Sequence, residues 1–170
     1  MKKDIFYESR NLEFFPEIKS FWKIHISSFF NNKKEILKIV SNYCNKNKLS
    51  YKYIKKIKFY KASLSKDFAP SQVGKYITIY MSNIKVFEKT VTDLYLLLKK
   101  FKATEIFGDF QYKNSIIFYR YGSFFDSFVY DLKSENNNKI LDLRQTYPNN
   151  IPNLKEVPFF HKIKPIKKIL

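Results

Sequence analysis

Alternating apolar and polar positions predict a strand near the N-terminus. In the range 20–27, SFWKIHIS, Trp22 and the isoleucines after it fall on one side of a period of two, which is typical of a strand with one buried face. Trp22 is therefore expected in the core. Lys23 and His25 share the opposite face of the same strand.

Apolar residues spaced by three and four positions predict two amphipathic helices. The first follows Asn31 and Asn32, either of which suits an N-cap, and ends near Asn47; the second spans 84–101. A third, lysine-faced helix is expected in the range 55–66.

Three further segments rich in β-branched and aromatic residues predict strands: 50–54, 74–81 and 115–121, the last stopping at Gly122. Beyond residue 131 the pattern loosens, and only ILDLR predicts a short strand. Strands interleaved with helices indicate an α+β fold, with a mixed or mostly antiparallel sheet flanked by helices.

Length and composition indicate one folded unit. The 170 residues fit a single domain, expected over 1–160, followed at 161–170 by a basic tail or a truncated linker to a kinase domain. The chain is 45% hydrophobic and 19% aromatic, so it suits a packed globule, and its net charge of +17 favours an anionic partner.

Several classes of protein are excluded by what the chain lacks. A single cysteine, Cys44, cannot form an internal disulfide, and together with two histidines it cannot supply a zinc site of the usual spacing. No apolar run approaches the roughly 20 residues of a spanning helix, and the N-terminus does not resemble a signal peptide. We expect a cytoplasmic protein with no membrane partner, no metal and no cofactor.

Arginine carries more information than lysine in this composition. An AT-rich codon bias inflates Lys, Asn, Ile, Phe and Tyr, whereas only Arg10, Arg120 and Arg144 are arginine. A guanidinium binds phosphate through two parallel hydrogen bonds that an ammonium cannot reproduce. The remaining arginines are therefore the better guide to chemistry.

Two constellations suit an anion. Lys23 and His25 lie about 6.6 Å apart on one strand face, so they can flank one bound phosphate. Arg120 and Tyr121 precede Gly122 at a predicted strand end, where a guanidinium can project into a pocket. The alternatives remain that the first pair is a polar strand edge, that Arg120 pairs with a surface carboxylate and that Tyr121 belongs to the core.

Four runs of sequence resemble one family. These are FWKIHIS, QVGKYITIYMS, SIIFYRYGSF, and DLRQTYP followed by VPFF. In order and spacing they resemble the N-terminal phosphoserine/phosphothreonine lyase domain of class III lanthipeptide synthetases, over about residues 7–160. That resemblance implies a fold like that of the phosphothreonine lyases which bacterial pathogens inject into host cells.

The implied activity is elimination of phosphate from a phosphorylated serine or threonine. The product is dehydroalanine or dehydrobutyrine in a lanthipeptide precursor peptide. In the synthetases a kinase and a cyclase-like domain follow, whereas this chain has no glycine-rich nucleotide loop and no HRD or DFG motif. We expect those partners either in a longer chain or as separate proteins.

The resemblance also implies roles for individual residues. His25 corresponds to the acid that protonates the leaving phosphate, Lys23 to a stabiliser of developing charge, and Lys52 to the base that removes the α-proton. Lys75, Arg120 and Arg144 correspond to groups that hold the phosphate. Tyr121 is expected close enough to orient the phosphate or the imidazole.

The choice of base depends on strand register, because Lys55, Lys56 and Lys58 follow Lys52 closely. Packing a lysine among other cations lowers its pKa from about 10.4, so a cationic pocket both binds phosphate and makes a base. The pocket equally opposes protonation of His25 until a dianion arrives.

Other functions remain open. The chain can instead be a non-catalytic basic binding module for a leader peptide or nucleic acid, although nucleic acid is the less favoured partner. A lyase that acts on folded phosphoproteins is a further alternative.

Overall fold

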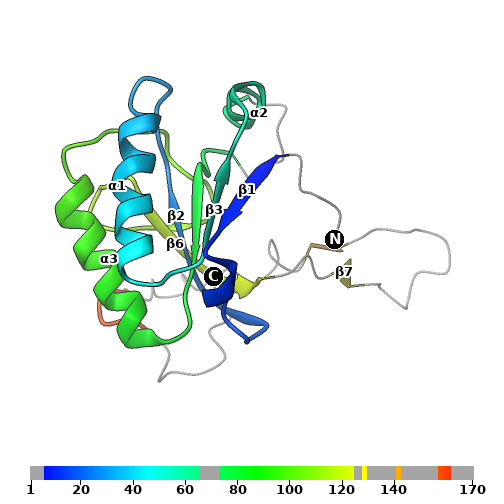
Figure 1. The fold of residues 1–170 in the computed structure, drawn as a ribbon, viewed down its shortest axis with the longest axis vertical. Coiled ribbons are helices and arrows are strands. Elements are labelled where there is room, and N and C mark those ends of the chain that lie inside the picture. The colour runs from blue at the N-terminus through cyan, green and yellow to red at the C-terminus, as the bar shows by residue number, and fades with distance from the viewer. Residues whose placement is uncertain (1–5, 66–72, 125–127, 130–140, 143–156, 162–170) are drawn as a thin grey trace, which may run out of the picture.

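A twisted antiparallel sheet organises the fold (Figure 1). The computed structural model describes residues 6–65, 73–124, 128–129, 141–142 and 157–161. Within them, six strands pair in the order β1-β3-β4-β2-β6-β5. Their bounds are β1 Tyr7–Arg10, β2 Ser20–Ile26, β3 Tyr51–Ile54, β4 Ile77–Tyr80, β5 Phe110–Gln111 and β6 Ile117–Ser123. A separate pair joins β7 (Phe128–Val129) to β8 (Leu141–Asp142).

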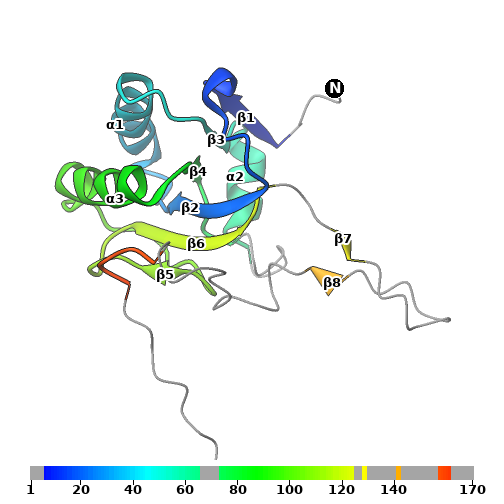
Figure 2. The same cartoon turned by 90° about the horizontal axis from the view of Figure 1, so that it is seen from below.

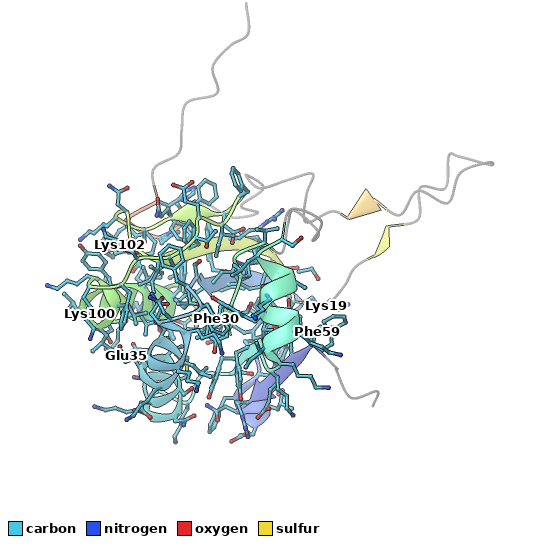
Figure 3. The ribbon with its side chains drawn as sticks, turned by 90° about the horizontal axis from the view of Figure 1, so that it is seen from above. Lys19, Phe30, Glu35, Phe59, Lys100 and Lys102 are labelled. Carbon is cyan, nitrogen blue, oxygen red and sulfur yellow. The ribbon has the colours of Figure 1, made fainter. Side chains whose placement is uncertain are left out.

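Helices cover the two faces of the sheet unequally. The helices are α1 (Lys33–Lys46), α2 (Ile57–Ser63) and α3 (Ile84–Leu98), with a 3₁₀ turn at Leu12–Phe14. Figure 2 shows α1 and α3 side by side on one face and the short α2 on the other. An ion pair of 2.8 Å between Glu35 of α1 and Lys100, just past α3, links this helical layer at its surface (Figure 3).

The core lies between the sheet and the α1–α3 layer. Trp22 is fully buried, as predicted, and its ring stacks on Phe87 of α3 with centroids 5.2 Å apart. Cys44 of α1 is buried in the same cluster, and burial raises the pKa of its thiol to about 12. The thiol is therefore a core group and is protonated at neutral pH.

The predicted α+β class is confirmed, and the sheet is antiparallel at every pairing among the described strands. The strand expected to stop at Gly122 continues to Ser123, because Gly122 and Ser123 pair with Phe21 and Ser20 of β2. The helix expected to reach residue 101 ends at Leu98. The short strands β1 and β5 were not predicted.

The side-chain N-cap expected of Asn32 is not formed. Asn32 does stand at the start of α1, but its side chain accepts from the Phe29 N–H and donates to the Lys102 carbonyl instead of capping the helix. In the described part of the chain, no helix combines the length and the apolar character needed to cross a bilayer.

The stacked pair of Trp22 and Phe87 predicts a large loss of stability on truncation. We expect Phe87→Ala to lower the free energy of unfolding by about 3–5 kcal/mol, the range for a fully buried aromatic side chain. Leu96→Ala on the same helix is the matched control, because Leu96 is 65% exposed. Urea denaturation followed by circular dichroism measures both, and equal losses would contradict this description of the core.

Candidate functional site

The strand register brings most of the predicted site residues to one face of the sheet. His25 of β2 is paired with Thr78 on one side and Phe118 on the other, and Lys23 is paired with Arg120 of β6. Directly paired residues of antiparallel strands project from the same face. Lys23, His25 and Arg120 therefore share the face opposite Trp22.

Lys52 lies on this face two strands away from His25. It is paired with Thr78, which in turn is paired with His25. Two strand spacings place the Lys52 and His25 backbones roughly 10 Å apart. The Lys52 ammonium lies 4.3 Å from the centre of the Tyr7 ring.

The register also separates Lys52 from the lysines that follow it. Lys55 lies past the end of β3 and pairs with Glu8 at 3.2 Å. Lys56 and Lys58 lie beside Phe59, next to or on α2. Of these four lysines, Lys52 is the one whose strand position matches that of His25.

Asp109 is a central residue of this face that the sequence analysis missed. Its carboxylate Oδ2 lies 2.5 Å from His25 Nδ1, and its side chain has no exposed surface. The register of β5 with β6 extends to place Asp109 opposite Arg120. The sequence feature that could have indicated Asp109 is the Gly108-Asp109 pair. In the structure Gly108 adopts a φ of +80° shortly before β5.

Lys75 enters the same cluster from the chain preceding β4. Its ammonium lies 3.5 Å from Asp109 Oδ1, and Lys75 is only 6% exposed. Gly74 makes this placement possible, because its φ is +80° and an added Cβ would lie 3.0 Å from the Glu105 carbonyl oxygen. The glycine-lysine pair of the motif thus has a structural basis.

Arg120 is buried to the same extent as Lys75, at 6% exposed. Its guanidinium charge helps to lower the pKa of the Asp109 carboxyl. Lys23 beside Arg120 donates a 2.7 Å hydrogen bond to the Ser123 carbonyl. A guanidinium presents several N–H donors in one plane, so Arg120 is suited to an anionic ligand.

The electrostatics keep His25 neutral and Asp109 ionised. Burial and the positive charge of Lys75 lower the pKa of His25 to about 4, although Asp109 opposes this shift. For Asp109, burial raises the pKa, but its interaction and hydrogen bond with His25 and the charges of Lys75 and Arg120 outweigh it, and the pKa is lowered. Neutral His25 then donates its Nδ1–H to Asp109, which leaves Nε2 as an acceptor.

The four side chains of Lys75, Arg120, Asp109 and His25 together carry a net positive charge. Lys75 and Arg120 are cationic, Asp109 supplies one negative charge and neutral His25 supplies none. A buried excess of positive charge is costly unless an anion compensates it. Lys23 adds a further cation at the rim.

Two predicted site residues are not part of this arrangement. Tyr121 is paired with Trp22, and the two rings contact edge to face at 5.4 Å, so Tyr121 lies on the opposite face of the sheet. Its expected position beside the imidazole is wrong, because consecutive residues of a strand point to opposite faces. Arg144 lies outside the described residues.

The site combines the cationic side chains of Lys75 and Arg120 with one imidazole and one carboxylate. Over the residues that the structure describes, no three His, Cys, Asp or Glu side chains gather as a metal would require.

Comparison with known proteins identifies the family. The family model described as "RamC, N-terminal domain" matches residues 17–162. The chain belongs to the RamC N-terminal domain family. That range contains Lys23, His25, Lys52, Lys75 and Asp109.

A curated relative of this RamC N-terminal domain is a "Probable SapB synthase" from Streptomyces coelicolor. It is 26% identical over 114 residues, which cover 67% of this chain and 12% of the relative. The chain therefore spans a small part of the length of the relative that it matches. Both findings point to the class III lanthipeptide synthetase family.

The lowered pKa of His25 predicts how stability depends on pH. Between pH 6.5 and about 4 the unfolded chain binds a proton that folded His25 does not, so stability is lost as pH falls through that window. We expect a loss of roughly 1–3 kcal/mol from this residue. Denaturation at several pH values measures it.

The control must separate His25 from His161, whose pKa burial also lowers. We expect His25→Gln to flatten the dependence of stability on pH more than His161→Gln does. An unchanged slope in His25→Gln would contradict the assignment.

Proposed function

We propose that this domain is a phosphoserine/phosphothreonine lyase that eliminates phosphate from a phosphorylated lanthipeptide precursor peptide. The products are dehydroalanine or dehydrobutyrine and inorganic phosphate. The observation that carries the proposal is the buried cluster of His25, Asp109, Lys75 and Arg120 on one face of the sheet. Membership of the RamC N-terminal domain family supports the assignment to lanthipeptide biosynthesis.

The phosphate is assigned to Arg120, Lys75 and Lys23. Arg120 has a buried guanidinium on the same face as His25, and Lys75 contributes a second buried cation. A dianion bound between them compensates the excess charge of the cluster. Arg144 joins this group as a proposal from the family resemblance alone.

The elimination needs a base at the Cα atom and an acid at the leaving group on the Cβ atom. The base takes the α-proton, the electron pair forms the double bond, and the C–O bond to phosphate breaks. We assign the base to Lys52, whose register places it on the same face as His25. Lys23 stabilises the negative charge that develops on the substrate carbonyl.

His25 protonates the leaving phosphate from Nε2. In the free protein its low pKa keeps it neutral, whereas a dianion at Arg120 and Lys75 offsets their repulsion and favours imidazolium. Asp109 holds Nδ1–H and stabilises that imidazolium. Substrate binding thus supplies the charge that makes His25 an acid.

The reaction implies partners of defined chemistry. A kinase must first phosphorylate the precursor, and a cyclase-type activity would consume the dehydrated residue. The Streptomyces coelicolor relative is named a synthase, and this chain matches 12% of its length. Such activities are therefore compatible with the rest of that larger protein.

A phosphothreonine peptide tests the activity directly. We expect mass spectrometry to show loss of phosphoric acid and formation of dehydrobutyrine. His25→Ala and Lys52→Ala should each lower the rate at least about 100-fold, the usual scale for a general acid or base. Lys55→Ala is the matched control and should retain activity, because Lys55 lies beyond β3 and pairs with Glu8.

The alternatives give different results in the same assay. Loss of HPO3 with threonine left behind indicates a phosphatase and overturns the proposal. Salt-sensitive binding of the peptide without any turnover favours a basic binding module.

Ligand-dependent protonation of His25 predicts the pH profile of turnover. With saturating phosphopeptide the rate should fall at high pH, as the imidazolium of the complex loses its proton. Single-turnover rates over about pH 6 to 9 measure this effect. A flat profile, in an enzyme whose rate still depends on His25, contradicts this role.

A further inference from the structure

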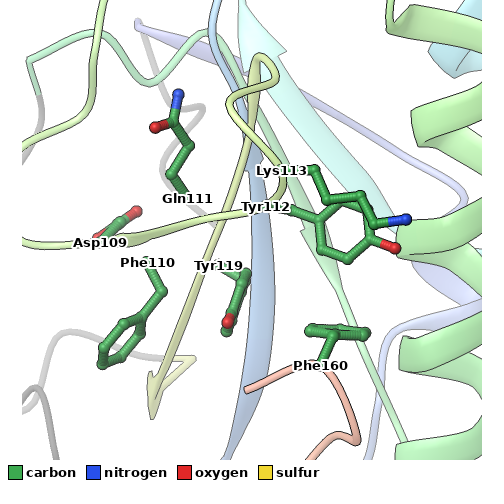
Figure 4. Close-up of a pocket in the computed structure, with 7 residues that line it drawn as sticks. All are labelled: Asp109, Phe110, Gln111, Tyr112, Lys113, Tyr119 and Phe160. Atoms are coloured by element: carbon green, nitrogen blue, oxygen red, sulfur yellow. The ribbon is translucent and has the colours of Figure 1, made fainter. Parts of the chain in front are cut away.

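A pocket lies beside the edge strand β5 (Figure 4). Its volume is about 610 Å³, within the range of pockets that bind small ligands or side chains. It is lined by Asp109, Phe110, Gln111, Tyr112, Lys113, Tyr119 and Phe160. Among these residues Asp109 also belongs to the His25 cluster.

Four aromatic rings form the body of this β5 pocket. Phe110 stacks on Tyr119 with centroids 5.6 Å apart. Phe160 contacts Tyr119 at 5.3 Å and Tyr112 at 5.0 Å, both edge to face. Such a lining suits an apolar side chain, since aromatic and aliphatic groups bury most surface against rings.

The Phe160 wall is held in place by its neighbours in the chain. The Phe159 N–H donates a 2.8 Å hydrogen bond to Glu88 of α3. On the other side of Phe160, the ring of His161 packs against Phe110 at 4.5 Å and lies 3.3 Å from the Tyr119 hydroxyl. The pocket is therefore largely formed before any ligand enters.

The polar groups of the β5 pocket do not favour a charged side chain. Asp109 directs its carboxylate to His25 and Lys75, and the Gln111 amide donates to the Ser115 carbonyl. The Lys113 ammonium lies over the rings of Tyr95 and Tyr112. A cationic guest would meet Lys113, and an anionic guest would lose water beside four aromatic rings.

The aromatic rings Phe110 and Tyr119 of the β5 pocket lie on the opposite face of the sheet edge from the His25 cluster. Phe110 is paired with Tyr119, whereas Asp109 comes one residue earlier and therefore projects to the His25 face. Because β5 ends the described sheet, a peptide can pass around it from one face to the other. Two strand spacings separate β2 from β5, about 10 Å, and rounding the edge adds a comparable distance.

We propose that the β5 pocket binds an apolar side chain of the phosphorylated peptide, about six residues from the residue that loses phosphate. An extended chain advances about 3.3 Å per residue, so this separation covers the path around β5. The site selects peptides that carry an aromatic or branched aliphatic residue at that distance. This inference rests on the proposed lyase function.

A positional scan tests the proposal. Fluorescein-labelled phosphothreonine peptides, otherwise polar, carry one leucine at each offset from one to eight residues on either side. Fluorescence anisotropy measures binding and mass spectrometry measures elimination. We expect one optimum, about six residues away on one side, with about tenfold higher affinity and kcat/KM than the leucine-free peptide.

A matched pair of variants assigns the effect to the pocket. Phe160→Ala should remove most of the leucine preference and leave the leucine-free peptide unchanged. Phe159→Ala should change neither, because Phe159 is 73% exposed and does not line the pocket. Phe160→Leu keeps an apolar wall and should retain the preference, which guards against a folding defect in the alanine variant.

The outcomes separate this inference from the proposed function. Elimination without any positional preference overturns the pocket assignment and leaves the lyase intact. Position-dependent binding that Phe160→Ala abolishes, without elimination, supports the pocket and overturns the lyase. A preference that survives Phe160→Ala places the apolar contact elsewhere.

Discussion

The hydrogen bond between His25 and Asp109 is the contact on which the site depends. It joins β2 to the chain just before β5, across the intervening strand β6, and both side chains are almost without exposed surface. In a medium of low polarity a carboxylate persists only if cations and donors surround it. Asp109 meets that condition through His25, Lys75 and Arg120, and in doing so gathers groups from four parts of the chain.

The two faces of β2 have different roles: the apolar face stabilises the strand, and the other face carries the polar cluster. Trp22, Ile24 and Ile26 are fully buried against the helical layer, so the strand is anchored by apolar contacts. The alternate residues Lys23 and His25 therefore place an ammonium and an imidazole on the other face. The antiparallel register converts this alternation into a site, because it sets Arg120 beside Lys23 and Lys52 in line with His25.

Much of this arrangement could be predicted from local patterns. The period of two identified β2 and the face shared by Lys23 and His25, and the helical spacing identified α1 and α3. Asp109 could not be predicted in this way, because its contact with His25 spans 84 residues and β5 is only two residues long. The position of Tyr121 on the opposite face could also be predicted from the sequence, because Tyr121 directly follows Arg120 and consecutive residues of a strand point to opposite faces.

In the proposed reaction, the proton transfers at Lys52 and His25 must balance. Lys52 gains the α-proton while His25 gives one to the leaving group, so the total charge of the two residues is unchanged across the elimination. Phosphate enters as a dianionic ester and leaves as hydrogen phosphate, which carries the same charge. Arg120 and Lys75 therefore hold the product as firmly as the substrate headgroup, and they offer no electrostatic drive for its release. Discrimination between substrate and product must come from the peptide, which binds through contacts outside the phosphate site.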